Sequence, residues 1–141
     1  MLKKFLKNQK GLTLIELLVV VVILGIIAAI AVPSVGGMID NSKKDAHVAN
    51  AQQMINSARL YQTSNPEATE VTFKDLLDGG YIDRMEDPDT GGADYSNNSK
   101  VSFDKENGTY SVYLRGGKRR IGASEGLILQ SNLSRDEVKN N

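Results

Sequence analysis

The chain contains no cysteine and no tryptophan, and it has a single histidine, His47, among its 141 residues. Without cysteine there is no disulfide framework, no thiolate zinc site and no cysteine nucleophile. The sequence also offers no phosphate-cradling glycine loop and no nucleophile paired with a base, so it predicts a protein that is not an enzyme. A small exported domain without disulfides depends on its core, on bound ions or on neighbouring subunits.

The chain also lacks a net charge, because 17 basic residues balance 17 acidic ones. Four of the bases, Lys3, Lys4, Lys7 and Lys10, fall within the first eleven residues, which contain no acid. The remainder carries 13 bases against 17 acids and is therefore mildly acidic. Lysines that precede an apolar run are retained on the cytoplasmic side of a membrane, so this asymmetry indicates topology rather than nucleic-acid binding.

A long apolar run follows the lysines. Residues 12–32 contain a single charge, Glu16, and as a helix they would be roughly 30 Å long, enough to cross a bilayer. Valine and isoleucine would suit strands in water, but inside lipid a helix satisfies every backbone group. Pro33 closes the run and Gly36-Gly37 follow, which predicts a bend or a local loosening there.

Residues 33–63 are expected to continue this helix as an amphipathic segment that ends near Thr63. Apolar residues recur there at steps of three and four, which places them on one helix face: Val48, Ala51, Met54, Ile55, Ala58 and Tyr61. His47 lies on the same segment and is predicted to be a surface or subunit-contact residue rather than a metal ligand.

Residues 64–141 have the pattern of a small α+β unit. Thr72 and Asp75 are spaced as a capping box for a short helix, and residues 83–99 form a long polar loop. Short strands are expected at 101–104, 109–114, 118–121 and 127–129, and the last eight residues are expected to be frayed or a single helical turn. The predicted fold class is α+β, with a long N-terminal helix packed on a small antiparallel sheet.

The segment from Lys10 to Pro33 carries the strongest functional signal. It reads KGLTLIELLVVVVILGIIAAIAVP, in which a short basic leader ends in Gly11 and is followed by a hydrophobic residue, Thr, Leu, Ile and Glu. This segment closely resembles the processing and assembly segment of type IV prepilins. The relatives of these prepilins, whose segments it also resembles, are the pseudopilins of type II secretion and of Gram-positive DNA-uptake machines. Gly25 and Pro33 also stand where that family usually has them.

The resemblance implies a precursor of four parts: a leader (1–11), an assembly helix (12–32), its amphipathic continuation (33–63) and a globular part (64–141). A prepilin peptidase would cut between Gly11 and Leu12 and methylate the new amine of Leu12. Gly11 has no side chain, which leaves the backbone open to a membrane protease.

The lollipop-shaped subunit implied by the family would wait as a single-pass protein in the plasma membrane, with its C-terminal part outside. An assembly ATPase and a membrane platform would then extract it into a surface filament made of copies of itself, which is an open, heterologous assembly.

Glu16 is the most informative residue of the run. A carboxylate near the centre of a membrane helix costs about 2.5–3.5 kcal/mol, so Glu16 needs a partner. In the family's assembly scheme that partner is the Leu12 amine of a neighbouring subunit, with Thr13 adding a hydrogen bond. Gly25 and Pro33 would loosen the helix on assembly, because both residues weaken helices.

Three roles remain open from the sequence. The first is the major pilin of a type IV pilus in a bacterium of Gram-positive type, and the alternative is a competence or type II secretion pseudopilin. The third role is a secreted or anchored binding domain with no filament, in which Ala29-Ile30-Ala31 would be a signal-peptidase site. Glu16 near the start of the run serves neither a signal peptide nor a plain anchor, which favours the prepilin interpretation.

Two weaker constellations lie in the C-terminal part. Five carboxylates in the polar loop are calcium candidates because calcium prefers several oxygen ligands: Asp83, Glu86, Asp87, Asp89 and Asp94. Their spacing lacks the full EF-hand pattern, and a solvated acidic loop is the simpler interpretation. Four bases could bind DNA phosphates on a filament, or could simply discourage edge-to-edge strand pairing: Arg115, Lys118, Arg119 and Arg120.

Overall fold

The computed structural model describes residue 11 and residues 13–141, and these residues fall into two compact units that divide between Ile39 and Asp40. One helix, α2 (Leu14–Ser64), runs through both units. The backbone stays helical through Pro33 and through Gly36-Gly37, where the sequence predicts a bend or a local loosening.

The first unit, in its described part, is the start of α2. Every described side chain from Thr13 to Ile39 is exposed, although most of them are apolar. Among the described residues, α2 is the one helix that is long and apolar enough to cross a membrane. This half of the helix therefore has no core of its own.

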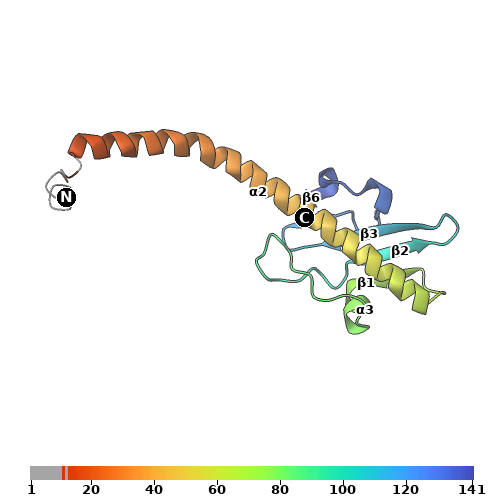
Figure 1. The fold of residues 1–141 in the computed structure, drawn as a ribbon. Helices are drawn as coiled ribbons and strands as arrows, with labels where there is room; N and C mark the ends of the chain where they lie inside the picture. The colour runs from red at the N-terminus through yellow and green to blue at the C-terminus, as the bar shows by residue number, and fades with distance from the viewer. Residues whose placement is uncertain (1–10, 12) are drawn as a thin grey trace, which may run out of the picture. The chain divides into compact units, whose positions relative to one another are not determined.

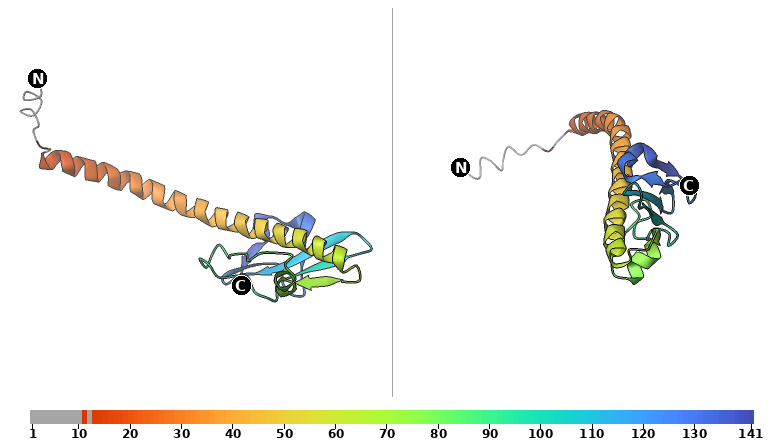
Figure 2. Two further views of the ribbon diagram at one scale, coloured as in Figure 1. Left: turned by 60° about the horizontal axis from the view of Figure 1, so that its bottom comes forward. Right: turned by 90° about the vertical axis from the view of Figure 1, so that its right-hand side faces the viewer.

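The second unit is an antiparallel sheet with the second half of α2 lying across one of its faces (Figures 1 and 2). The sheet runs in the order β1-β2-β3-β4-β6, and β5 also pairs with β3. The strands are β1 (Glu70–Thr72), β2 (Lys100–Asp104), β3 (Thr109–Arg115), β4 (Arg119–Ile121), β5 (Ile128–Leu129) and β6 (Val138–Asn140). The remaining elements are α3 (Phe73–Asp78) and two short 3-10 turns, η1 (Gln130–Asn132) and η2 (Arg135–Glu137).

The core lies between α2 and the sheet. From α2 it takes Ala51, Met54, Ile55 and Ala58, the residues expected from the helical spacing. The strands contribute alternate residues, and the short helix adds Phe73 and Leu76, both fully buried. Because side chains of a strand alternate between its faces, the intervening strand residues point to the opposite face of the sheet.

The predicted fold class is confirmed: a long helix packs on a small antiparallel sheet. The capping box of α3 is also confirmed, since Thr72 and Asp75 exchange both hydrogen bonds. The turn between β2 and β3 holds Gly108 at a φ of 65°, a conformation that favours glycine.

Two predictions about local structure were wrong. The last eight residues are not simply frayed or a single turn, because Val138–Asn140 forms β6 and pairs with β4. A polar sequence hides this strand, since only Val138 faces the core. His47 is also not a surface residue, because only 1% of it is exposed.

Candidate functional site

The first turn of α2 brings together two of the predicted assembly residues. The backbone N–H of Thr13 donates to Glu16 Oε2 over 2.7 Å, and the backbone N–H of Glu16 donates to Thr13 Oγ1 over 3.3 Å. This reciprocal pair is a capping box, which satisfies N–H groups that a helix start leaves without partners. Glu16 has no further hydrogen-bond partner among the described residues, so its carboxylate caps its own helix and remains exposed.

The other residues of the predicted segment are open. A Cβ atom built at Gly11 or at Gly25 would meet no atom within 4 Å. Gly25 is therefore not required for packing inside the described part of the subunit. Leu12 and the leader lysines, on which the predicted cut and its topology depend, lie outside the described residues.

A second group of functional side chains, the buried charge cluster, consists of His47, Asp87, Asp89 and Arg119. The Nε2 atom of His47 lies 2.8 Å from Asp89 Oδ2 and 3.7 Å from Asp87 Oδ1. Arg119 Nε lies 3.6 Å from Asp89 Oδ2, and the same guanidinium is hydrogen-bonded to Asp40 of α2. The cluster thus joins α2, the 83–99 loop and β4 by charge.

Backbone groups hold Asp87 in this cluster. Its carboxylate is fully buried and accepts hydrogen bonds from the N–H of Asp89 and the N–H of Gly117. A Cβ at Gly116 would lie 2.4 Å from Asp87 Oδ2, so only glycine leaves the carboxylate its position. Without these two donors, the buried carboxylate would have lost its hydration and would have no backbone hydrogen bonds to replace it, which is strongly unfavourable for a charged group.

The other side of the His47 ring faces Tyr95. His47 Nδ1 lies 2.8 Å from the Tyr95 hydroxyl, which accepts a hydrogen bond from Asn50. Burial, together with the nearby Asp87 and Asp89 carboxylates, raises the pKa of Tyr95 well above its usual range, although the Asn50 hydrogen bond opposes this. The protonated phenol can then donate to His47 Nδ1, which leaves the Nε2 proton for Asp89.

The five predicted calcium ligands do not converge on one point. Asp94 pairs with Arg84, and Asp83 and Glu86 are exposed, whereas Asp87 and Asp89 turn inward. Together with His47 these two offer ligand atoms within 4.8 Å of one another, a set that suits a divalent cation. The guanidinium of Arg119 already supplies positive charge beside them.

The four predicted nucleic-acid ligands are also divided. Arg119 points to α2 and belongs to the buried charge cluster. Arg115 and Lys118 are exposed and Arg120 is partly exposed. The alternation of side chains along β4 explains this division, because Arg119 and Ile121 share the helix-facing side and Arg120 takes the other.

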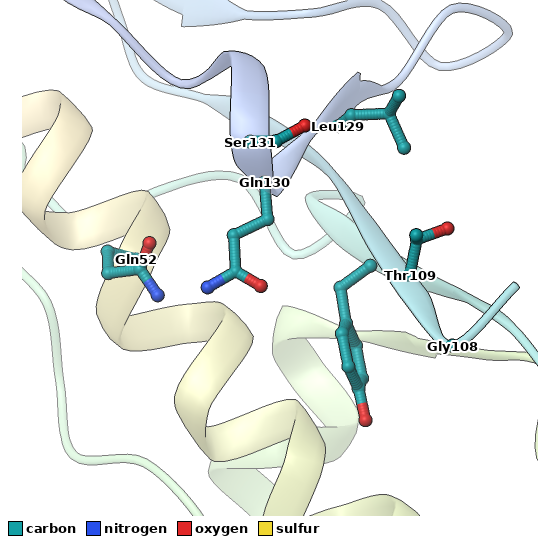
Figure 3. A pocket seen from close by; sticks show the side chains of 7 residues that line it. Gln52, Gly108, Thr109, Leu129, Gln130 and Ser131 are labelled. Atoms are coloured by element: carbon teal, nitrogen blue, oxygen red, sulfur yellow. The ribbon is translucent and has the colours of Figure 1, made fainter.

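A surface pocket of about 390 Å³ lies between α2 and the β3–η1 region (Figure 3). Amide groups of Gln52 and Gln130 point into it (Figure 3). Its polar groups are largely engaged already, since Gln130 accepts from Arg59 and the Tyr110 hydroxyl donates to Gln62.

Comparison with known proteins identifies the family of the N-terminal segment and of the chain. The family model of the prokaryotic N-terminal methylation motif matches residues 6–32. The type II secretion system core protein G of Aeromonas hydrophila is 32% identical over 98 residues, which cover 58% of this chain and 68% of that protein. The chain belongs to the type IV pilin and pseudopilin family.

Two further relatives show how far this pilin-family likeness extends. The type II secretion system core protein G of Vibrio cholerae serotype O1 is 29% identical over 134 residues, covering 84% of this chain and 88% of that protein. The type IV major fimbrial protein FimA of Dichelobacter nodosus is 39% identical over 77 residues, covering 52% of this chain and 49% of FimA. No solved structure matches the chain at comparable significance.

Sequence reasoning missed the buried charge cluster, although a signal for it exists. His47 precedes Ala51, Met54 and Ala58 by steps of four, three and four residues, so it continues the buried stripe of α2 by one turn. A histidine on a buried stripe requires polar partners. The nearest acid in the sequence, Asp45, is exposed, and the partners of His47 come from a distant segment.

Proposed function

We propose that this pilin-family chain is a structural subunit of a surface filament, not an enzyme, and that a prepilin peptidase cuts it between Gly11 and Leu12. The methylation-motif match over residues 6–32 and the exposed Gly11 support the cut and the methylation of the Leu12 amine. The four lysines of the leader would hold the cleavage site on the cytoplasmic face of the plasma membrane.

The observation that carries this proposal is the first half of α2. Every described side chain from Leu14 to Ile39 is exposed and, apart from Glu16, uncharged. An apolar surface of this length has to be covered by lipid or by protein. The subunit would therefore wait in the membrane as a single-pass protein, and its helix would then pack against identical helices in the filament. An assembly ATPase and a membrane platform would drive that transfer.

Glu16 would link processing to assembly. In the isolated subunit its carboxylate binds only Thr13 among the described residues, within the same helix turn. Cleavage creates an amine at Leu12, and in the low-dielectric filament core the carboxylate of one subunit would pair with that amine on a neighbour. The capping box holds the Glu16 side chain at the helix start until that partner arrives.

The extent of the similarity favours a pseudopilin as the specific role. The match to core protein G of Vibrio cholerae reaches 84% of the chain and so extends into the residues that form the sheet, whereas the FimA match covers 52%. A major pilin remains the second candidate, and in that role the filament would be abundant and extend from the cell.

The test begins with the mature N-terminus. The full chain is expressed with and without a prepilin peptidase, and the product is analysed by N-terminal sequencing and intact mass. We expect a mature chain that begins with methylated Leu12, and an uncut precursor for Gly11→Val. A mature chain beginning at Val32 would overturn the proposal, because it would identify residues 1–31 as a signal peptide.

A second measurement concerns assembly. Cells that produce the chain together with the assembly machinery are sheared, and the filament fraction is examined by electron microscopy and mass spectrometry. We expect filaments that contain this chain. A correctly processed chain that stays entirely in the membrane fraction would show that the first half of α2 is an anchor and not an assembly element.

A further inference from the structure

The arginines of the chain differ in whether the subunit satisfies them. Four of the six have an acceptor on another side chain: Arg59 with Gln130, Arg84 with Asp94, Arg119 with Asp40 and Arg135 with Asp45. The other two, Arg115 and Arg120, have no side-chain hydrogen bond and no ion pair among the described residues. These two arginines are also paired with each other across β3 and β4.

The strand register places these two arginines directly opposite one another. Arg115 of β3 faces Arg120 of β4, and Arg120 in turn faces Lys139 of β6. Three cations therefore lie side by side on three neighbouring strands, on the face of the sheet away from α2. The neighbours that point to the core are Leu114, Ile121 and Val138, all buried.

This row of cations is unfavourable in the isolated subunit. Directly opposite side chains in an antiparallel pair have Cβ atoms about 5 Å apart, and like charges at that separation destabilise the sheet. In the described part of the chain, the Nε atom of Arg120 is moreover buried from solvent without a hydrogen-bond partner, as is the Nη1 atom of Arg119 in the buried charge cluster. A buried donor without an acceptor has lost its hydrogen bonds to water without replacing them, which is destabilising.

A surface pocket of about 300 Å³ is lined by Tyr113, Arg115, Arg120 and Asn141. The Asn141 side chain is fixed there because its amide donates to the carbonyls of Gly116 and Gly117 over 2.9 and 3.1 Å. Glu137 is the acidic residue nearby: it lines an adjoining depression with Arg120 and Lys139, but pairs with neither.

We infer that this pocket is a binding site for a phosphate group. Two guanidinium groups present planar forks of N–H donors, which match the oxygens of a tetrahedral oxyanion better than a lysine ammonium does. A bound phosphate would accept hydrogen bonds from the accessible N–H groups of Arg115 and Arg120 and would relieve the repulsion between the two guanidinium groups. The phosphate can belong to a free phosphomonoester or to a phosphodiester of a larger molecule.

The pocket of Figure 3 does not share this property, although its volume is larger. No cation of the described residues lines it. Arg59 of α2 contacts two of its lining residues, because it donates to Gln130 and lies over the Tyr110 ring at 4.7 Å from the centroid. The anion site is therefore distinguished by its two guanidinium groups without a side-chain partner, and not by its volume.

The experiment uses the full chain, uniformly labelled with nitrogen-15, in micelles of a nonionic detergent. The Nε–H signals of the arginines are followed while sodium phosphate replaces sodium chloride at constant ionic strength and neutral pH. We expect saturable shifts for Arg115 and Arg120, and none for Arg59 and Arg135. Equal shifts of all arginines would overturn the site, because they would report diffuse attraction.

Two variants and one control test the pocket itself. Arg115→Ala and Arg120→Lys should each weaken phosphate binding about tenfold, because each removes charge-assisted hydrogen bonds. Arg120→Lys keeps the charge and therefore the fold. The matched control is Lys74→Ala, which removes an exposed cation from α3 and should bind phosphate as the unaltered chain does. Full binding by Arg120→Lys would overturn the built site, since charge alone would then suffice.

A parallel titration with dimethyl phosphate assigns the source. Binding of both probes supports a phosphodiester ligand, and binding of inorganic phosphate alone supports a phosphomonoester or free phosphate. A response to neither probe overturns the inference. The subunit is not assembled in these measurements, so their outcome is independent of the proposed filament function.

Discussion

The two halves of α2 are one continuous helix with opposite requirements. From Leu14 to Ile39 the described side chains are exposed, and Glu16 is the single charge. From Asp40 to Ser64 the helix buries one stripe, and both of its acidic side chains are paired with arginines of other elements, Asp40 with Arg119 and Asp45 with Arg135. The first half has to find its partners outside the chain, whereas the second half has found them within it.

This difference separates the two tasks of a pilin-family subunit. The second half of α2 can be as variable as its own sheet permits, because its contacts are internal. The first half must pack against the same half of every other copy, so its sequence is constrained by assembly. Substitutions in the first half should change assembly without changing folding, and substitutions in the second half should do the reverse.

The largest expected effect is that of Glu16→Ala on assembly. Removing one partner of a buried charge pair costs about 3–5 kcal/mol, so filament yield should fall at least about a hundredfold. The variant should still enter the membrane and still be cut after Gly11. Quantitative mass spectrometry of the sheared filament fraction and of the membrane fraction measures both.

Thr13→Ala is the matched control for this prediction. It removes the hydroxyl that accepts from the Glu16 N–H but keeps the carboxylate. A lost N-cap costs about 1 kcal/mol, so assembly should fall by less than it does for Glu16→Ala. Equal losses for both variants would assign the role of Glu16 to helix capping rather than to pairing with a neighbour.

The second prediction compares two large apolar side chains, one in each unit. Phe73 is fully buried in the core under α2, whereas 61% of Leu18 is exposed. Phe73→Ala should lower the free energy of unfolding by about 3–5 kcal/mol. Leu18→Ala should leave it unchanged and should lower filament yield instead. Denaturant unfolding in nonionic detergent, followed by the signals of the second unit, measures the first effect.

A loss of stability from Leu18→Ala equal to that from Phe73→Ala would contradict the distinction between the two halves of α2. It would show that the first half of α2 contributes to the folding of the isolated subunit.

The features that the sequence could predict are local patterns, and those that it could not predict depend on contacts between distant segments. The apolar run, the stripe of Ala51, Ile55 and Ala58, and the Thr72–Asp75 capping box are local patterns, and the structure contains each of them. The partners of His47 are Asp87 and Asp89, some forty residues away, and no local pattern contains such a pairing. The strand at Val138–Asn140 was missed for the same reason, because its identity depends on β4.

The phosphate pocket is an intermediate case. The sequence identifies Arg115, Arg119 and Arg120 as a basic group, but it does not show that Arg119 turns to the helix. Only the register of β3 with β4 distinguishes the arginine that is used internally from the two that are not.

The third prediction concerns the buried charge cluster. Asp87→Asn keeps the shape of the side chain but replaces one acceptor oxygen with an NH₂ group. That group would face the N–H of either Asp89 or Gly117, both of which now donate to Asp87. Leaving one buried donor unsatisfied costs about 1–3 kcal/mol, which should appear in denaturant unfolding of the second unit.

Glu86→Gln is the control for Asp87→Asn. Its side chain is exposed one position away, so the same chemical change should leave stability within about 0.5 kcal/mol of the original. If Asp87→Asn were as mild as Glu86→Gln, the carboxylate would not be what holds the 83–99 loop against α2. Filament assembly should not distinguish these two variants when both are folded.

The smallest expected effect is that of pH on the Asp45–Arg135 ion pair, which joins α2 to η2 at the surface. The hydrogen bond from Arg135 lowers the pKa of Asp45 below its ordinary value; desolvation opposes this shift, and the positive charge of Arg135 adds to it. A carboxyl whose pKa is lower in the folded state binds fewer protons there than in the unfolded state. The pair therefore stabilises the fold above about pH 4, the unfolded pKa, and this contribution is lost as pH falls through the folded pKa.

Asp45→Asn should remove that contribution. The variant should unfold slightly more easily than the unaltered chain at neutral pH, and the difference should shrink as pH falls below about 4 and as salt is added. Asp78→Asn, an exposed aspartate without an ion pair among the described residues, controls for the change in net charge. A difference that persisted unchanged into strong acid would mean that Asp45 acts through packing and not through its charge. Packing, and not the Asp45–Arg135 ion pair, would then hold this part of α2 against η2. Paired charges would therefore contribute less to the difference between the two halves of α2 than the structure indicates.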